Sequence, residues 1–297
     1  MKLDILAFGA HPDDVELGCA GTLAKEISLG KKVGIIDLTQ GELGTRGSAE
    51  LRRKEADEAA RILQISVREN LCFADGFFLN DKHHQLEIVK KLRKYRPEIV
   101  ICNPFEDRHI DHGKGGKLVS DACFLSGLRR IETTDENGNP QEAWRPKVVY
   151  HYIQWKDLRP DFVVDITGFL EKKIEAVYAY RSQFLPDEGN DPQTVITSQN
   201  FQDSIKFRAQ ELGMLINRDY AEGFNVERYV ALWAVGVRSV QQALDLAVKA
   251  IQDPQTSHEG RIVTLYFVQQ TQITYTDIAT YAEAHFGEAS DLDYWLL

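Results

Sequence analysis

The sequence lacks the features that mark several large classes of protein. No apolar run approaches the ~20 residues that a bilayer-spanning helix needs, and the first residues do not form a signal peptide, so we expect no membrane contact. Positive charge is in deficit, because 35 Lys and Arg residues stand against 45 Asp and Glu residues. The resulting net charge of -10 argues against a general nucleic-acid binder.

Cysteine is also scarce in this chain. The four cysteines, Cys19, Cys72, Cys102 and Cys123, are scattered along 297 residues and form no C-x-x-C pair. A disulfide framework is therefore not expected, and we predict a reducing, cytoplasmic compartment in which the cysteines serve as packing residues. A hydrophobic content of 43% is enough for an ordinary globular core.

Short apolar runs alternate with helical patterns in the first half of the chain. The expected strands lie at residues 3–9, 33–39, 71–74 and 98–102. The expected helices lie at residues 18–29, 48–63, 86–95 and 113–128. This alternation predicts an α/β fold with a Rossmann-like, mostly parallel sheet flanked by helices.

The second half contains two turn-rich segments, residues 133–145 and 186–194, which we expect to be loops. The expected strands lie at residues 148–153 and 162–166, and the expected helices at residues 169–182 and 201–215. Near residue 237 the character of the sequence changes. We therefore predict a main domain at residues 1–236 and a small C-terminal extension of unknown role at residues 237–297.

Histidine and aspartate gather in two short segments that each follow an apolar run. The first contains His11 and Asp14, and the second contains His109, Asp111 and His112. In open α/β sheets the carboxyl ends of strands form the ligand-binding edge, so the two segments are expected to meet. Imidazole and carboxylate suit Zn²⁺, and a catalytic zinc keeps three protein ligands and an open position. The pattern therefore predicts a metal-dependent hydrolase.

The remaining polar residues of these segments suggest catalytic roles. Asp13 lies beside the predicted ligands, where a carboxylate can act as a general base toward a metal-activated water. His109 can act as an acid or face a developing oxyanion, and Asp111 can orient an imidazole. Helix capping alone would also place Asp and His at such positions, but two clusters at two strand ends favour the metal site. The pair His83 and His84 precedes a basic helix and is expected at the surface.

The two segments, together with several later stretches, resemble the PIG-L/LmbE family of zinc-dependent N-acetylglucosamine deacetylases. The matching stretches are AHPDD at 10–14, TQGELGTRG at 39–47, ELRRKEA at 50–56, HIDH at 109–112, YRSQF at 180–184 and YAEGF at 220–224. The later stretches resemble the branch that deacetylates N-acetylglucosaminyl-L-malate in bacillithiol biosynthesis. The resemblance covers residues 1–236.

The resemblance implies a single zinc ion per chain, although Fe²⁺ suits the same ligand types. Its three ligands would be His11, Asp14 and His112. Asp13 would be the general base and later the acid that protonates the leaving amine. His109 would stabilise the tetrahedral intermediate, with Asp111 orienting it.

The resemblance also implies how a small-molecule N-acetylglucosaminide would be bound. Arg52 would contact the malate carboxylate through its guanidinium, and Glu42 and Arg46 would contact sugar hydroxyls. Phe201 stands where some relatives carry a tyrosine that donates to the oxyanion. Relatives of this fold are often homo-oligomers, which implies the same here.

Other functions remain open from the sequence. A chito-oligosaccharide or a thiol conjugate is an alternative substrate for the same chemistry. A non-enzymatic Rossmann-type binding protein is a different class, although the first strand is followed by Gly9-Ala10-His11 rather than the G-x-G-x-x-G loop of dinucleotide binders. The extension at residues 237–297 would allow an adaptor that uses the deacetylase as a scaffold.

Overall fold

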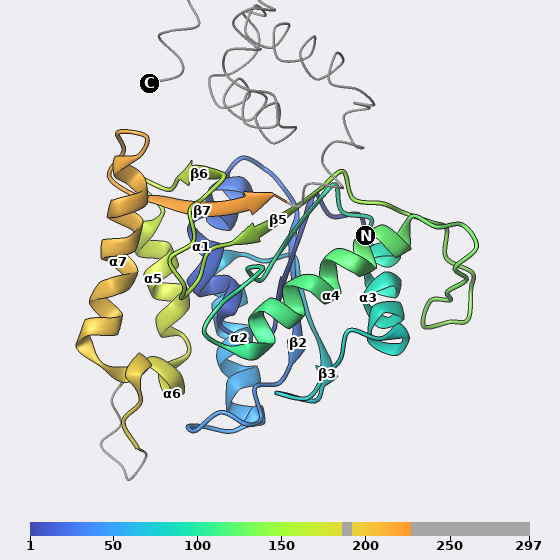
Figure 1. Cartoon of the computed structure of the whole chain (residues 1–297), viewed down its shortest axis with the longest axis horizontal. Coiled ribbons are helices and arrows are strands. Elements are labelled where there is room, and N and C mark those ends of the chain that lie inside the picture. Colours follow the sequence, from blue (N-terminus) through green and yellow to red (C-terminus); the bar gives the residue numbers. More distant parts are fainter. Residues whose placement is uncertain (186–191, 227–297) are drawn as a thin grey trace, which may run out of the picture. The chain divides into compact units, whose positions relative to one another are not determined.

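The computed structural model describes residues 1–185 and 192–226, and these contain one mixed sheet of seven strands (Figure 1). The strands are β1 (Ile5–Gly9), β2 (Val33–Thr39), β3 (Val67–Phe73), β4 (Ile99–Cys102), β5 (Val148–Tyr152), β6 (Phe162–Asp165) and β7 (Ala221–Val226). Their order is β3-β2-β1-β4-β5-β7-β6. The first five run parallel, whereas β7 is antiparallel to both β5 and β6. The predicted α/β fold with a mostly parallel sheet is confirmed.

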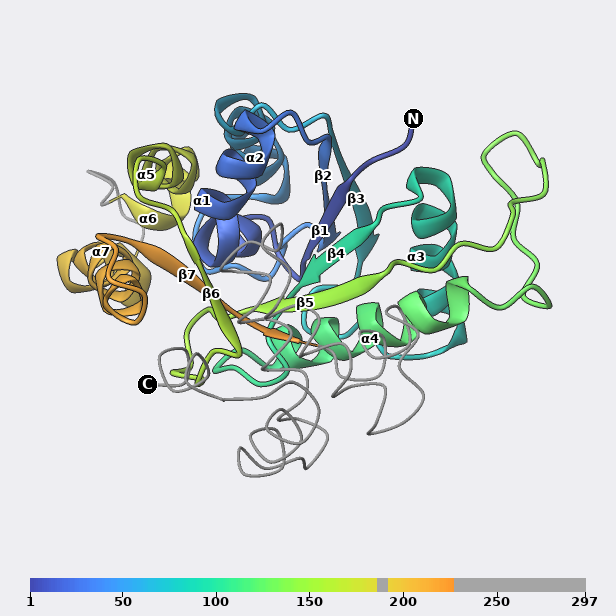
Figure 2. The ribbon, with the colours of Figure 1, turned by 90° about the horizontal axis from the view of Figure 1, so that it is seen from above.

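Helices cover both faces of the sheet (Figure 2). The helices are α1 (Asp14–Ser28), α2 (Ala49–Leu63), α3 (Lys82–Tyr95), α4 (Ile110–Ser126), α5 (Leu170–Tyr178), α6 (Arg181–Phe184), α7 (Gln199–Met214) and the 3₁₀ turn η1 (Val195–Thr197). Helices α3 and α4 pack together on one face, and α5 packs against α1 and α2 on the other. Within the described part of the chain, no helix is long and apolar enough to cross a membrane.

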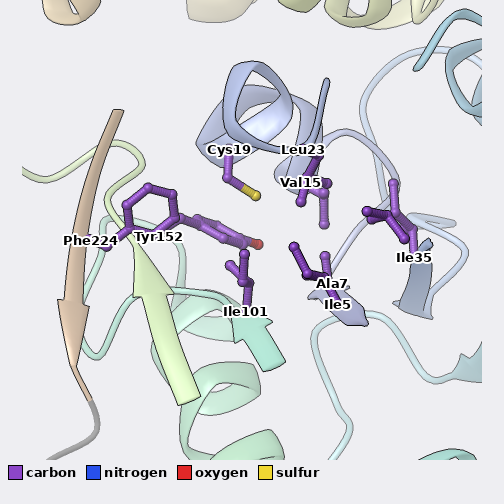
Figure 3. Packing of buried hydrophobic residues seen from close by; sticks show 10 residues of the cluster. Ile5, Ala7, Val15, Cys19, Leu23, Ile35, Ile101, Tyr152 and Phe224 are labelled. Carbon is purple, nitrogen blue, oxygen red and sulfur yellow. The ribbon is translucent and has the colours of Figure 1, made fainter. Parts of the chain in front are cut away.

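One cluster of the hydrophobic core lies between α1 and the sheet (Figure 3). Helix α1 turns Val15, Cys19 and Leu23 toward β1, whose five residues are all buried. A strand buried on both faces explains why β1 reads as a continuous apolar run rather than an alternating one. Burying each large aliphatic side chain contributes about 1.5–3 kcal/mol, so this interface fixes α1 firmly against the sheet. The position of its first turn, which carries the metal-site residues, follows from that packing.

The order of the strands creates a crevice at one edge of the sheet. From β1 the chain proceeds to β2 and β3 on one side, then crosses to β4 on the other side of β1. Strands β1 and β4 pair in parallel, from Ile5 with Ile99 to Ala7 with Ile101, so their carboxyl ends lie side by side. This is the switch point at which open α/β sheets bind ligands.

Several elements differ from the prediction, and helices α1 and α3 each begin four residues before the predicted start. Strand β7 was not predicted, because it contains the buried polar residues Glu222 and Asn225, which interrupt its apolar pattern. Strand β3 begins at Val67, four residues before the predicted start, since ion pairs accommodate its polar first half. The single helix predicted at 169–182 is divided into α5 and α6. The predicted extension at 237–297 lies outside the described residues.

Candidate metal centre

The turn between β1 and α1 carries three of the predicted site residues. Asp14 opens the helix, and Asp13 is its N-cap residue, with φ of 117° in the left-handed region that non-glycine residues rarely adopt. An N-cap aspartate usually accepts a helix N–H, but the carboxylate of Asp13 makes no capping bond. It accepts a hydrogen bond from Arg52 Nη2 instead, at 2.6 Å. Such local strain is typical of functional sites.

The structure brings the predicted metal ligands together. Asp14 Oδ2 lies 3.5 Å from His11 Nδ1, and Asp14 Oδ1 lies 3.1 Å from His112 Nε2. Tetrahedral zinc with bonds of about 2.0–2.2 Å would separate its ligand atoms by about 3.3–3.6 Å, which the His11–Asp14 distance matches. The contact of 3.1 Å with His112 involves the other carboxylate oxygen of Asp14. All three side chains are buried, and each belongs to a ligand type that zinc accepts. The donor set therefore fits a zinc ion.

The third histidine of the cluster widens the choice of ligands. Nitrogen atoms of His11, His109 and His112 all lie within 4.8 Å of one another. His109 is half-buried, whereas the other two rings are buried. Its ring meets the ring of His11 edge-on at 4.6 Å between centroids. His109 thus borders the ligand set, where it can contact a group bound at the metal.

Electrostatics favour a cation at this point. Burial opposes the charged form of His112, yet the charge of Asp14 and a hydrogen bond to Asp107 raise its pKa to about 9. Burial likewise opposes ionisation of Asp14, yet His112 and His11 hold its pKa well below the ordinary value. Positive charge is therefore stabilised among these groups, as binding of a metal ion requires.

Two amide side chains hold the Asp14 carboxylate in place. Asn103 Nδ2 donates to Asp14 Oδ2 at 3.0 Å, and Gln154 Nε2 donates to Asp14 Oδ1 at 2.6 Å. The backbone N–H of His11 also donates to Oδ2, at 2.9 Å. Partners of this kind orient metal ligands and are part of the site.

The other nitrogen of His11 faces two carboxylates. Its Nε2 lies 3.0 Å from Asp75 Oδ1 and 3.5 Å from Asp111 Oδ2. With Nε2 protonated and hydrogen-bonded to a carboxylate, Nδ1 is left free to bind a metal. Burial disfavours the charged ring, but Asp111, Asp14 and Asp75 together hold the pKa of His11 well above its ordinary value.

His109 and Asp111 are arranged differently from the relay expected between them. The Asp111 carboxylate faces His11 and Lys114, at 2.7 Å from Lys114 Nζ, rather than the ring of His109. His109 is the N-cap residue of α4, and its Nδ1 accepts the backbone N–H of Asp111 at 3.3 Å. Because Nδ1 is an acceptor, the neutral ring carries its proton on Nε2. Burial and the charges of His11 and His112 lower the pKa of His109, which favours that neutral form.

Asp13 differs in its pKa from the neighbouring carboxylates of Asp14, Asp75 and Asp111, whose pKa values are lowered. Burial raises its pKa to about 7, although the positive charge of Arg52 opposes the shift. Both side chains are less than a tenth exposed, so water screens their pairing little. A carboxyl group with a pKa near neutrality can both accept and donate a proton during a reaction cycle.

The cluster lies in a pocket of about 720 Å³. Its lining includes Arg46, which is buried, and Arg52, and their contact with substrate stays a prediction. Glu42 does not line this pocket. Its carboxylate accepts the backbone N–H groups of Asp75 and Gln40, so it fixes the loop instead. The phenyl ring of Phe201, which has no hydroxyl to donate, stacks between other aromatic rings of the pocket.

Sequence reasoning missed several residues of this centre. Asp75, Asn103 and Gln154 contact the predicted ligands, and each follows closely on the end of a parallel strand. The rule that drew attention to His11 would have found them too. Of the predicted packing cysteines, three are buried, but Cys72 is exposed. Of the predicted surface pair, His83 is exposed on α3, whereas His84 is half-buried with its ring against Phe73.

Comparison with known proteins identifies the family. The sequence model of PIG-L, described as GlcNAc-PI de-N-acetylase, matches residues 6–123. The diacetylchitobiose deacetylase of Thermococcus kodakarensis is 31% identical over 194 residues, which cover 62% of this chain and 71% of that protein. The chain belongs to the PIG-L family. The predicted family is therefore confirmed.

Two further likenesses bear on the enzyme and its fold. The mycothiol S-conjugate amidase of Streptomyces coelicolor is 34% identical over 183 residues, covering 50% of this chain and 60% of that protein. The crystal structure of the conserved protein TT1542 from Thermus thermophilus has a TM-score of 0.66 and 36% identity, covering 75% of this chain and 93% of that one. Deacetylases and amidases hydrolyse amide C–N bonds, which confirms the prediction of an enzyme and sets aside the non-enzymatic binding protein.

The end of the chain matches a different family. A second sequence model, described as a family of unknown function (DUF5724), matches residues 216–297. It overlaps β7 and continues through the predicted C-terminal extension. The role of the extension and its predicted boundary at residue 237 stay predictions.

Proposed function

We propose that this protein is a zinc-dependent hydrolase that removes the acetyl group from N-acetylglucosaminyl-L-malate in bacillithiol biosynthesis. The observation that carries the proposal is the buried set His11, Asp14 and His112 with the Asp13 carboxyl group beside it. The diacetylchitobiose deacetylase and the mycothiol S-conjugate amidase among the relatives support a GlcNAc-type substrate. The stretches YRSQF and YAEGF support the malate branch.

The three ligands would hold one zinc ion with an open position for water and the acetyl oxygen. When bound, the metal would activate a water molecule and polarise the amide carbonyl. Asp13 accepts a proton from the attacking water at its carboxylate. It then passes that proton to the nitrogen of the departing glucosamine, so that the amine leaves neutral. A pKa of about 7 suits both halves of this cycle.

His109 stabilises the oxyanion in the proposed mechanism. Its neutral ring presents Nε2–H, because Nδ1 accepts the backbone N–H of Asp111. A fixed donor aimed at a developing negative charge is worth about 10²–10³ in rate. The amino end of α4 begins at this residue, and the helix dipole adds a favourable potential there. Asp111 acts as a positioning residue through His11.

The test is acetate release from N-acetylglucosaminyl-L-malate by purified protein, with the metal content quantified and a chelated sample as control. Chelator-sensitive turnover with about one zinc per chain supports the proposal. If the turnover rate follows the iron content rather than the zinc content, the metal at these ligands would be assigned as Fe²⁺. A zinc-loaded protein that releases no acetate from this compound would contradict the malate substrate.

A second candidate substrate class is favoured by the relatives themselves. A chito-oligosaccharide or a thiol conjugate of glucosamine would present the same N-acetyl group to the centre. Diacetylchitobiose and a mycothiol-type conjugate in the same acetate assay separate the candidates by their kcat/KM. The cytoplasmic location and the homo-oligomeric state remain predictions, which fractionation and light scattering would test.

A further inference from the structure

Arg46 occupies an unusual position for a charged side chain. It lies in the loop between β2 and α2, lines the pocket and is only 4% exposed. The loop is held there because Gln183 Nε2 donates to the carbonyl oxygen of Arg46 at 2.8 Å. The buried Nε of Arg46 has no hydrogen-bond partner. Within residues 1–185 and 192–226 no carboxylate forms an ion pair with its guanidinium.

A buried guanidinium without a carboxylate is costly, and proteins almost always pair one. Two other buried cations that line this pocket follow that rule. Arg52 pairs with Asp13 at 2.6 Å, and Lys173 pairs with Glu222 at 2.6 Å. Arg46 departs from it, so the partner that balances its charge is expected to come from a ligand.

We propose that Arg46 binds a carboxylate on the part of the substrate attached to the sugar, which makes the enzyme selective for anionic aglycones. The inference rests on the proposed function and transfers to Arg46 the contact that the sequence assigned to Arg52. Arg52 already pairs with the Asp13 carboxylate, whereas no carboxylate of the described residues pairs with Arg46. A planar fork of donors matches a carboxylate, and burial strengthens the pairing.

The surroundings of the pocket explain why a dedicated cation is needed. The carboxylates of Asp14 and Asp75, which pair with no lysine or arginine of the described residues, lie at the metal cluster and would repel an anionic substrate. A buried cation in the same pocket offsets that repulsion at the point where the anionic group lies. A volume of 720 Å³ is in the range of about 300–1,000 Å³ that accommodates ligands larger than one sugar.

Arg108 is the competing candidate for the same role. It lines the pocket and stacks on the ring of Trp155, with its guanidinium carbon 4.5 Å from the ring centroid. However, Arg108 is exposed, so water satisfies its donors and screens its charge without any ligand. Exposed charge pairs contribute little, and selectivity is therefore expected to follow Arg46.

The first experiment compares Arg46→Gln and Arg46→Lys with the control Arg53→Gln, which removes the same charge from an exposed position of α2. Each variant is assayed on N-acetylglucosaminyl-malate and on its uncharged diamide. Arg46→Gln is expected to lower kcat/KM about 10- to 100-fold on the malate compound and less than about 3-fold on the diamide, with partial rescue by lysine. Equal losses on both compounds would overturn the proposal, as would loss of selectivity in Arg108→Gln instead.

A second experiment does not depend on turnover. Glucosaminyl-malate has no acetyl group to lose, and its binding is measured by the shift in thermal unfolding, with methyl glucosaminide as the uncharged control. The wild type should be stabilised by glucosaminyl-malate and Arg46→Gln should not, whereas without ligand the variant should unfold at or above the wild-type midpoint. A marked loss of ligand-free stability would mean that Arg46 is structural.

The two experiments separate the inference from the function on which it rests. Arg46-dependent binding of glucosaminyl-malate without acetate release would preserve the anion site and contradict the deacetylase. Acetate release with the same malate-to-diamide preference in wild type and Arg46→Gln would preserve the deacetylase and contradict the anion site.

Discussion

Arg52 is the residue for which the sequence and the structure suggest different partners. Family resemblance assigns it to the substrate carboxylate, but its Nη2 lies 2.6 Å from Asp13 Oδ2 and both side chains are less than a tenth exposed. We predict that Arg52 acts through Asp13, as a positioning residue for the general base. The decisive perturbation is a double-mutant cycle of Arg52→Gln and Asp13→Asn.

The expected magnitudes follow from the burial of the pair. Removing a positioned base costs about 10²–10⁴ in kcat, which sets the effect of Asp13→Asn. A hydrogen bond between charged groups contributes about 1.5–3 kcal/mol, so Arg52→Gln should lower kcat about 10- to 150-fold in the wild-type background. In the Asp13→Asn background the same change should cost less than about 3-fold, because its target has already gone.

The assay records kcat and KM on N-acetylglucosaminyl-malate at matched metal content, with Arg53→Gln as the control. Chemical denaturation of the same four proteins gives a parallel cycle for stability. In Arg52→Gln the Asp13 carboxylate is buried without a partner, which should lower the free energy of unfolding by up to about 3–5 kcal/mol. Protonation of Asp13 would reduce this loss, and the double variant, which has no carboxylate there, should recover part of it. If the two substitutions lowered kcat independently, so that the loss in the double variant equalled the product of the single losses, and if Arg52→Gln raised KM, the reasoning would be refuted. Arg52 would then be assigned to binding of the substrate carboxylate.

Three further predictions concern stability. Burial opposes ionisation of Glu69, but Lys91, Tyr95 and Lys94 together lower its pKa to about 2. The stabilisation from this carboxylate is therefore complete above the ordinary pKa of 4.5 and is lost as the pH falls toward 2, and Glu69→Gln should abolish about 1–2 kcal/mol of this dependence in acid denaturation. Arg68→Met leaves two buried carboxylates unpaired and should cost about 3–5 kcal/mol in urea unfolding, whereas Arg61→Met, at an exposed pair, should leave the urea midpoint unchanged. Gly18→Ala places a methyl group 2.3 Å from the ring of buried Tyr152 and should lower the free energy of unfolding by about 1–3 kcal/mol in thermal denaturation. An unchanged stability would mean that α1 and β5 pack less closely than described.

Much of the fold was predictable because the parallel strands are buried on both faces. The run at Ile5–Gly9 and the run at Val33–Thr39 contain apolar residues with little interruption, and both strands form within two residues of the prediction. Strand β7 was missed for the opposite reason. Its Glu222 is buried because it accepts the backbone N–H groups of Gly21 and Thr22 and pairs with Lys173. Residues that are satisfied by tertiary partners carry no apolar signal in the sequence.

The site was predictable to the extent that its residues follow strands. His11, Asp14 and His112 were placed together by the rule that strand ends meet at one edge, and the structure brings them within ion-pair distance. Pair assignments were harder, because they depend on side-chain direction. The sequence cannot show that Asp111 faces His11, or that Asp13 faces Arg52 across the loop that joins β2 to α2.

Charge balance links the centre to its substrate. The net charge of -10 argues against a general nucleic-acid binder, yet it says little about a pocket in which charges are balanced locally. Asp13 is balanced by Arg52, and Asp111 is balanced by Lys114, which leaves positive charge to be supplied to the remaining carboxylates by a metal ion. Arg46 is then the buried charge left without a partner among the described pocket residues. The same reasoning that favours a cation at the histidine cluster therefore favours an anion beside Arg46, and the proposed N-acetylglucosaminide with a carboxylate aglycone would supply it.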